Sequence, residues 1–184
     1  MNKTAIAIAI GAVAVLGLIL MPKAEAAIMN TNTSGALGVP AGGLGAYANF
    51  FAFDDLFRAA GAQYGVDPLL LKAIAIHESS LNPNAANTSD PADPSYGLMQ
   101  MSCMPDGSGG CRASEFNLPG WPPANQQALF DPATSIGLGA ALMAQNLRAV
   151  QGNVWQAVAM YNSGQTYDPA YTNAVSSIYK QMGG

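Results

Sequence analysis

Residues 67–79 read Asp-Pro-Leu-Leu-Leu-Lys-Ala-Ile-Ala-Ile-His-Glu-Ser. Asp67 can cap the free N–H groups of a helix while Pro68 fits its first position, so this stretch predicts a helix that leads to Glu78. The part from residue 68 to residue 76 is almost wholly apolar. The sequence therefore predicts a helix that is buried over most of its length.

Glu78 is the unusual residue of this helix. The helix dipole disfavours negative charge near a C-terminal end. Glu78 shares one helical face with Ala75, Ile74 and Leu71, so its carboxyl extends an apolar stripe. That placement should desolvate the carboxyl and raise its pKa, as a general acid at neutral pH requires. A solvated glutamate at a frayed helix end is the alternative interpretation.

The rest of the chain favours a mainly α fold. Asp-Pro pairs predict helices over residues 131–150 and 168–182, an aromatic cluster predicts an amphipathic helix within 50–65, and Asn153 can cap a helix that ends near residue 161. No alternating strand pattern of useful length is present. Residues 82–125 are predicted to be irregular, and loops this long inside compact domains are usually functional.

The N-terminal residues predict export. Residues 5–21 form a 17-residue stretch without charge, and Ala24-Glu25-Ala26 matches a small-x-small cleavage pattern, so residues 1–26 are expected to be a signal peptide. Because 17 apolar residues are just long enough to span a bilayer, an uncleaved membrane anchor is the alternative. Residues 27–45 are predicted to be a flexible spacer, and residues 46–184 a single catalytic domain.

Charge and cysteine content exclude several classes of protein. From Ala27 onward the chain has ten acidic and five basic residues and no basic run, which excludes a nucleic-acid surface and disfavours an anionic membrane surface. In an exported protein, Cys103 and Cys111 are expected to form a disulfide, with two buried free thiols as the alternative. Two cysteines and one histidine cannot fill a tetrahedral zinc site, and no metal or cofactor is predicted.

Three motifs follow one another along the chain: Glu78-Ser79 followed by Asn82-Pro83 and Ala85, then Gly97-Leu98-Met99-Gln100, then Tyr161-Asn162-Ser163-Gly164. Together they resemble the lytic transglycosylase family with the soluble-type catalytic domain. The resemblance covers about residues 50–182. It implies a goose-lysozyme-like fold, mainly α with a minor β part, and a glycan cleft formed by the long loop region. It also implies cleavage of the β-1,4 bond between N-acetylmuramic acid and N-acetylglucosamine in peptidoglycan, with a 1,6-anhydro product.

The resemblance assigns roles to single residues. Glu78 matches the family's only catalytic acid/base, and Ser79 matches the serine that supports it. The other matches are expected substrate contacts: Met99, Gln100, Tyr161 and Asn162. A buried tyrosine needs a partner for its hydroxyl, and Glu78 offers one to Tyr161. Met99 also suits the core, because methionine fills irregular gaps.

Two further residues have open or structural interpretations. His77 is expected to be structural, because adjacent residues of a helix point apart. Trp121 is either a platform on which a sugar stacks or an anchor in the core.

Two other functions compete with the transglycosylase. One is a hydrolytic lysozyme of the same fold, in which Asp90, Asp93 or Asp106 positions water. The other is a non-catalytic wall-binding component of an envelope-spanning machine or a virion, against which the intact Glu78-Ser79 pair argues. Under each of these functions we expect peptidoglycan glycan strands as the partner. The expected location is the periplasm or cell envelope, or a virion membrane if the chain is phage-encoded.

Overall fold

The structure is a computed structural model that describes residues 37–38 and 47–184. The export segment expected at residues 1–26, its apolar stretch 5–21, and the expected spacer other than Leu37 and Gly38 lie outside the described residues. Helices and three short strands make up the domain, which confirms the mainly α prediction. The elements are α1 (Asp54–Tyr64), α2 (Pro68–Ser79), β1 (Ala86–Asn87), β2 (Ser95–Tyr96), β3 (Met101–Ser102), η2 (Gln126–Phe130), α3 (Pro132–Ala149), α4 (Val154–Ser163) and α5 (Pro169–Gln181).

The helices begin where the Asp-Pro pairs predict. The side chain of Asp67 accepts a hydrogen bond from Leu69 N at 2.8 Å, and that of Asp131 accepts one from Thr134 N at 2.8 Å. Asp168 caps α5 in the same way, and in all three helices the proline occupies the first turn.

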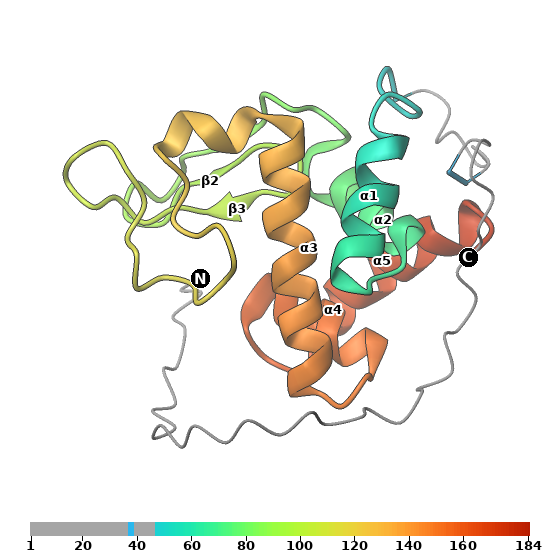
Figure 1. The fold of residues 1–184 in the computed structure, drawn as a ribbon. Coiled ribbons are helices and arrows are strands. Elements are labelled where there is room, and N and C mark those ends of the chain that lie inside the picture. The colour runs from blue at the N-terminus through green and yellow to red at the C-terminus, as the bar shows by residue number, and fades with distance from the viewer. Residues whose placement is uncertain (1–36, 39–46) are drawn as a thin grey trace.

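The five α-helices contact one another in a closed ring. α1 packs on α2, α2 on α5, α5 on α4, α4 on α3, and α3 again on α1. Figure 1 shows α3 between the other helices on one side and the small sheet on the other. The residues of α2 from Leu70 to Ile76 are all buried, as predicted, whereas His77 is exposed and Glu78 is half-buried. The last turn of α2 thus brings its side chains from the core to the surface.

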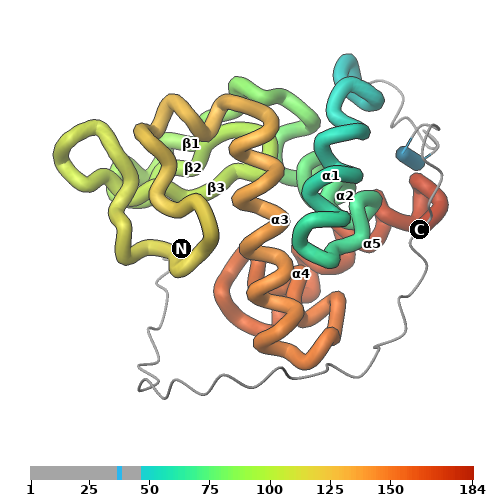
Figure 2. Tube along the Cα trace, in the orientation of Figure 1, coloured from blue at the N-terminus to red at the C-terminus, as the bar shows by residue number. Residues whose placement is uncertain are grey.

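Residues 82–125 are more regular than the sequence predicts. They contain an antiparallel sheet in the order β1-β2-β3, in which Asn87 pairs with Ser95 and Tyr96 pairs with Met101. The tube in Figure 2 shows the three strands side by side. Each strand has two residues, which is too short for an alternating pattern, so periodicity could not locate the minor β part that the family resemblance implies.

Gly97 ties this sheet to the helices. Its φ of +76° lies in the left-handed region, and a Cβ at this position would stand 1.9 Å from the carbonyl oxygen of Leu129 in η2. A side chain cannot fit in that space. The backbone of the Gly97–Gln100 segment is therefore held directly against η2 and the start of α3.

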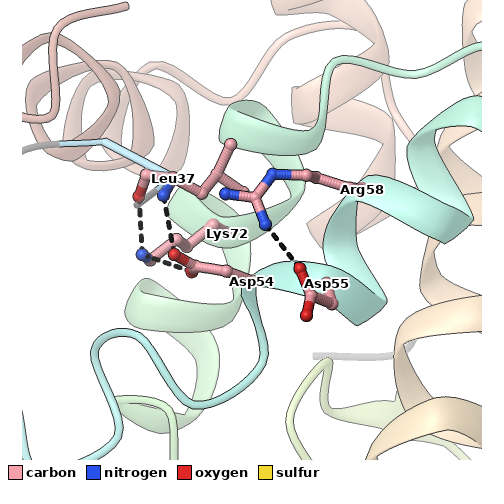
Figure 3. Close-up of polar contacts among 5 residues, drawn as sticks. All are labelled: Leu37, Asp54, Asp55, Arg58 and Lys72. Atoms are coloured by element: carbon pink, nitrogen blue, oxygen red, sulfur yellow. Dashed lines mark hydrogen bonds and ion pairs between the residues drawn. The ribbon is translucent and has the colours of Figure 1, made fainter. Parts of the chain in front are cut away.

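Leu37 is fastened to the helical domain by a buried ion pair. Figure 3 shows the side chains of Asp54 of α1 and Lys72 of α2 next to each other, both directed at the backbone of Leu37. Leu37 N donates to Asp54 Oδ2 at 2.6 Å, Lys72 Nζ donates to Leu37 O at 2.6 Å, and the two side chains are 2.8 Å apart. Burial lowers the pKa of Lys72, and its ammonium also lies 3.8 Å from the ring centre of Phe50. Leu37, which lies within the expected flexible spacer 27–45, thus contacts both α1 and α2.

Over residues 37–38 and 47–184, none of the helices is both long and apolar enough to cross a membrane.

Candidate active site

Glu78 and Asn162 lie where two surface hollows meet. The first hollow has a volume of about 450 Å³ and the second about 220 Å³. The first is lined by His77, Glu78, Asn162, Asp168, Ala170 and Tyr171, and the second by Glu78, Asn87, Ser89, Asp90, Asp93, Ser95, Gln100 and Asn162. We call this pair of hollows the groove. Most of the residues that line the groove have polar side chains. The lining of the first hollow comes from α2, α4, α5 and the residue that caps α5, and the second hollow adds residues of the sheet region.

A tyrosine from α5 holds the carboxyl of Glu78. The hydroxyl of Tyr171 donates to Glu78 Oε1 at 2.5 Å, and its ring makes an edge contact with His77, with 4.9 Å between ring centres. Burial, and then the charge of Glu78, raises the pKa of Tyr171 well above its usual range. The hydroxyl therefore stays protonated and remains a donor. The sequence patterns did not indicate Tyr171 as a site residue, although it follows the Asp168 cap by three residues and so lies in the first turn of a predicted helix.

Tyr161 has a different partner from the one expected. Its hydroxyl donates to the carbonyl oxygen of Met99 at 2.8 Å and lies 3.6 Å from the sulfur of Met101. The hydroxyl proton is therefore directed at Met99 and not at Glu78 as expected, and the buried side chain lines neither hollow. The predicted contact of Tyr161 with a substrate stays a prediction. Burial and the nearby charge of Glu78 raise the pKa of Tyr161 well above its usual range, so it too is a permanent donor.

Met99 is a core residue and does not line the groove. Its side chain has no exposed surface and packs on α3, where the Cβ of an alanine at position 139 would stand 2.7–2.9 Å from it. The predicted substrate contact of Met99 is thus wrong for its side chain. The physical reason is that the Gly97–Gln100 segment is held against η2 and the start of α3, so the Met99 side chain points into the core.

Ser79 and Gln100 hold the backbone that shapes the groove. Ser79 Oγ lies 2.9 Å from Leu98 O and 3.0 Å from Ala75 O, which ties the end of α2 to the Gly-Leu-Met-Gln segment. Ser79 thus supports Glu78 through the main chain.

Gln100 has a φ of +44°, and its Nε2 donates to Gly97 O at 3.0 Å and to Ala85 O at 3.2 Å. Its side chain also lines the second hollow.

Asn162 lies beside Glu78 in both hollows and is held by the residue that caps α5. Its Nδ2 donates to Asp168 Oδ2 at 2.8 Å. This hydrogen bond is the main cause that lowers the pKa of Asp168, and a hydrogen bond from Tyr171 N is the second. Asp168 therefore remains a carboxylate. Asp168 was expected only as a helix cap, and its place in the groove was missed by the sequence reasoning.

Of the three aspartates considered for water positioning, two lie in the groove. Asp90 and Asp93 line the second hollow together with Glu78. Asp106 does not line either hollow. Its carboxylate accepts hydrogen bonds from Ser108 and Gly110 of its own loop, so its candidate role in the site is wrong.

The loop that carries the cysteines lies outside the lining of the groove. Cys103 and Cys111 form a disulfide. Trp121 packs edge-on against Phe116, with 4.7 Å between ring centres, and its Nε1 donates to Arg112 O at 3.0 Å. Of the two interpretations left open for Trp121, the contacts favour the anchor. In the part of the chain that the structure describes, no three His, Cys, Asp or Glu side chains are placed to hold a metal ion.

Known proteins share this sequence pattern. Protein IpgF of Shigella flexneri is 28% identical over 110 residues, which cover 60% of this chain and 66% of that protein. The membrane-bound lytic murein transglycosylase C of Sodalis glossinidius is 32% identical over 59% of this chain and 30% of its own length. The invasion protein IagB of Salmonella typhimurium is 27% identical over 61% of this chain and 64% of its own length. The chain thus spans no more than about two thirds of the curated relatives that it matches.

A solved structure shares the fold. The lytic transglycosylase Slt of Pseudomonas aeruginosa aligns with 72% of this chain and 24% of its own, at a TM-score of 0.55 and 23% identity, which supports the lysozyme-like architecture. Residues 55–177 match the model of the transglycosylase SLT domain. Because this match covers more than half of the chain, the protein belongs to the transglycosylase SLT domain family.

Proposed function

We propose that this protein is a peptidoglycan lytic transglycosylase in which Glu78 is the catalytic acid and base. The observation that carries the proposal is the position of Glu78 at the junction of the two hollows, with Tyr171 bound to one of its oxygens. A glycan laid along the groove has sugars on both sides of Glu78, as cleavage within a chain requires. Membership of the SLT domain family and the similarity to lytic murein transglycosylase C support the same substrate.

The first step is the break of the glycosidic bond. Glu78 transfers its proton to the bridging oxygen between N-acetylmuramic acid and N-acetylglucosamine, the C1–O bond breaks, and the leaving sugar gains a 4-hydroxyl. The 2-acetamido group stabilises the positive centre at C1. Tyr171, by donating to Oε1, fixes the rotation of the carboxyl. A carboxyl held by one oxygen can carry its proton on the other, which we expect to face the bridging oxygen.

The second step closes the product. Glu78, now ionised, takes the proton of the 6-hydroxyl of the same muramic acid. The freed O6 attacks C1 and forms the 1,6-anhydro ring, which returns Glu78 to its acid form. Since the nucleophile belongs to the substrate, no water and no second carboxylate take part, and the high effective molarity of an intramolecular group replaces both.

One observation favours a second candidate, a hydrolytic lysozyme. Asp90 and Asp93 share the second hollow with Glu78, and two carboxylates flanking a scissile bond are the usual arrangement of a glycosidase. The product separates the two functions, because hydrolysis leaves reducing muramic acid ends and the transglycosylase leaves anhydro ends.

We further propose that the enzyme acts in the cell envelope and opens the wall locally for an envelope-spanning machine. The similarities to a membrane-bound murein transglycosylase and to the invasion protein IagB support this place of action. The acidic groove lining and the excess of acidic residues suit a neutral glycan better than an anionic polymer.

Digestion of purified peptidoglycan sacculi tests the proposal. The full chain should release muropeptides with 1,6-anhydro ends, identified by mass spectrometry, and Glu78→Gln should lower the rate by about 10³-fold because the general acid is lost. Circular dichroism should show that the variant keeps its fold. Reducing ends in place of anhydro ends would support the lysozyme, and undiminished digestion by Glu78→Gln would exclude both enzymes.

A further inference from the structure

Asp168 performs two tasks with its two carboxylate oxygens. Oδ1 accepts from Tyr171 N at 3.1 Å and caps α5, as the aspartates of the other Asp-Pro pairs cap their helices. Oδ2 accepts from Asn162 Nδ2 at 2.8 Å, and neither of the other two caps has a comparable bond to a groove residue. The hydrogen bond from Tyr171 N is sufficient to cap α5, so the hydrogen bond from Asn162 needs a separate explanation.

The contact between Asp168 and Asn162 fixes the direction of an amide. A side-chain amide can usually rotate by half a turn and exchange its oxygen and nitrogen. An ionised carboxylate only accepts hydrogen bonds, so Asn162 must turn its nitrogen toward Asp168. The carbonyl oxygen of Asn162 then points away from Asp168. Asn162 lines both hollows, whereas Asp168 lines only the first. The carbonyl oxygen of Asn162 can therefore face the middle of the groove beside Glu78.

We propose that Asp168 is a positioning residue that makes Asn162 present its carbonyl oxygen to the acetamido N–H of an N-acetyl sugar in the groove. This inference rests on the proposed function, since it concerns the glycan that Glu78 would cleave. Fixing the amide matters only for a ligand group of fixed polarity. A sugar hydroxyl can donate or accept and would bind either end of Asn162, whereas an amide N–H can only donate.

An exchange of the two side chains separates positioning from capping. Asparagine caps helices as well as aspartate does, so Asp168→Asn should keep α5 intact. The new amide nitrogen at position 168, however, would face the Asn162 side chain. Asn162 would then have to turn its oxygen toward position 168 and its nitrogen toward the sugar. Asn162→Asp alone would set two carboxylates against each other. In the double variant N162D/D168N, the new carboxylate accepts from the new amide and again offers an oxygen to the groove.

The experiment measures binding of a purified peptidoglycan tetrasaccharide by titration calorimetry in the Glu78→Gln background. This background prevents turnover and removes the charge of Glu78 beside position 162. Each single variant should weaken binding by about tenfold, roughly the worth of one hydrogen bond. The double variant should recover to within about threefold of the parent. Asp131→Asn, which alters an equivalent cap on α3 away from the groove, should bind as the parent does.

The outcomes keep this inference apart from the proposed function. If wild type digests sacculi but Asp168→Asn binds as tightly as Asp131→Asn, Asp168 is only a cap and the inference is wrong. The same conclusion follows if the double variant binds no better than the single variants. If wild type leaves sacculi intact, the proposed function fails first, and that result is obtained without any variant of Asp168.

Discussion

A carboxylate in the last turn of a helix faces the negative end of the helix dipole, so Glu78 gains from a nearby hydrogen-bond donor. Tyr171 supplies it from α5, 93 residues further along the chain. Tyr161, the tyrosine that the family motif places beside the glutamate, instead satisfies a buried carbonyl of Met99. Two buried tyrosines close to one carboxylate therefore have separate tasks, one for the reacting group and one for the backbone.

Removing each hydroxyl should separate these tasks. Tyr171→Phe takes away the donor to Glu78, so we expect kcat for sacculus digestion to fall by about 10- to 100-fold. The free energy of unfolding should change little, because Glu78 is only partly buried and lines the groove, where water can replace the lost bond.

Tyr161→Phe is the matched variant. It leaves the buried carbonyl of Met99 without its donor and should cost about 1–3 kcal/mol in the free energy of unfolding. Its kcat should fall less than that of Tyr171→Phe. Urea unfolding and initial rates on sacculi measure both quantities, and equal kcat losses in the two variants would contradict the division of tasks.

At the scale of elements, the contact between the Gly-Leu-Met-Gln segment and α3 positions the groove. Gly139 makes room for the Met99 side chain, while Ser135 Oγ accepts from Met99 N at 3.1 Å. Two glycines stand close together in α3, but only one of them is crowded. A Cβ at Gly137 would meet nothing within 4 Å.

The two glycines should therefore respond oppositely to alanine. Gly139→Ala places a methyl group 2.7–2.9 Å from three Met99 side-chain atoms, including Cβ, and overpacking of this kind typically costs about 1–3 kcal/mol. Gly137→Ala has space and removes a flexible residue from a helix, so it should stabilise the domain by about 0.4–1 kcal/mol. Chemical denaturation of both variants checks the signs. Equal effects would mean that Met99 moves aside freely.

The ends of elements were the most predictable part of the fold. Asp67, Asp131 and Asp168 cap the helices that their sequence context indicates, and Gly65 ends α1 with a left-handed φ of +70°. These signals act within three or four residues of the chain. The positions of the strands could not be predicted, although the family resemblance implies a minor β part, because the strands are held by pairing across residues 86–102 and by the fit of Gly97 against Leu129.

At the scale of the whole molecule, the half-buried carboxyl of Glu115 joins the loop that carries the cysteines to the sheet. Glu115 Oε2 accepts from Met104 N at 2.8 Å, and Glu115 Oε1 lies 2.5 Å from Ser102 Oγ, which also contacts Asp93. Burial is the main cause that raises the pKa of Glu115 above its ordinary value of 4.5, and the charge of Asp93 acts in the same direction.

The stability of the domain should therefore depend on pH through Glu115. Because its folded-state pKa is raised, its contribution is fully present below pH 4.5 and is lost as the pH rises through the folded-state value. Glu115→Gln can keep both hydrogen bonds without titrating. The Tm of wild type minus that of Glu115→Gln should fall as the pH is raised from about 4.5 toward 7.

Asp131→Asn is the control variant, because the contribution of Asp131 to stability depends on pH in the opposite direction from that of Glu115. The pKa of Asp131 is lowered by hydrogen bonds from Thr134, so its contribution is present above its ordinary value of 3.8 and is lost as the pH falls. Between pH 4.5 and 7 the Tm difference between wild type and this variant should stay constant. A Glu115→Gln difference that is equally flat would show that Glu115 is ionised in the folded protein.

The sequence by itself determined the helices and their starts, the burial of α2, the place of Glu78 at its end and the family to which the chain belongs. The helices, their starts and the burial of α2 depend on side-chain periodicity and on caps that act over a few neighbouring residues, whereas the family was indicated by the resemblance of three short motifs. Only the tertiary structure decided that Tyr171 binds Glu78, that Met99 faces the core and that Asp168 holds Asn162. The first of these contacts joins residues 93 apart, and the others depend on which face of a segment is buried. Such choices follow from how the ring of helices closes on the sheet region, because packing across elements is not encoded in any one local pattern.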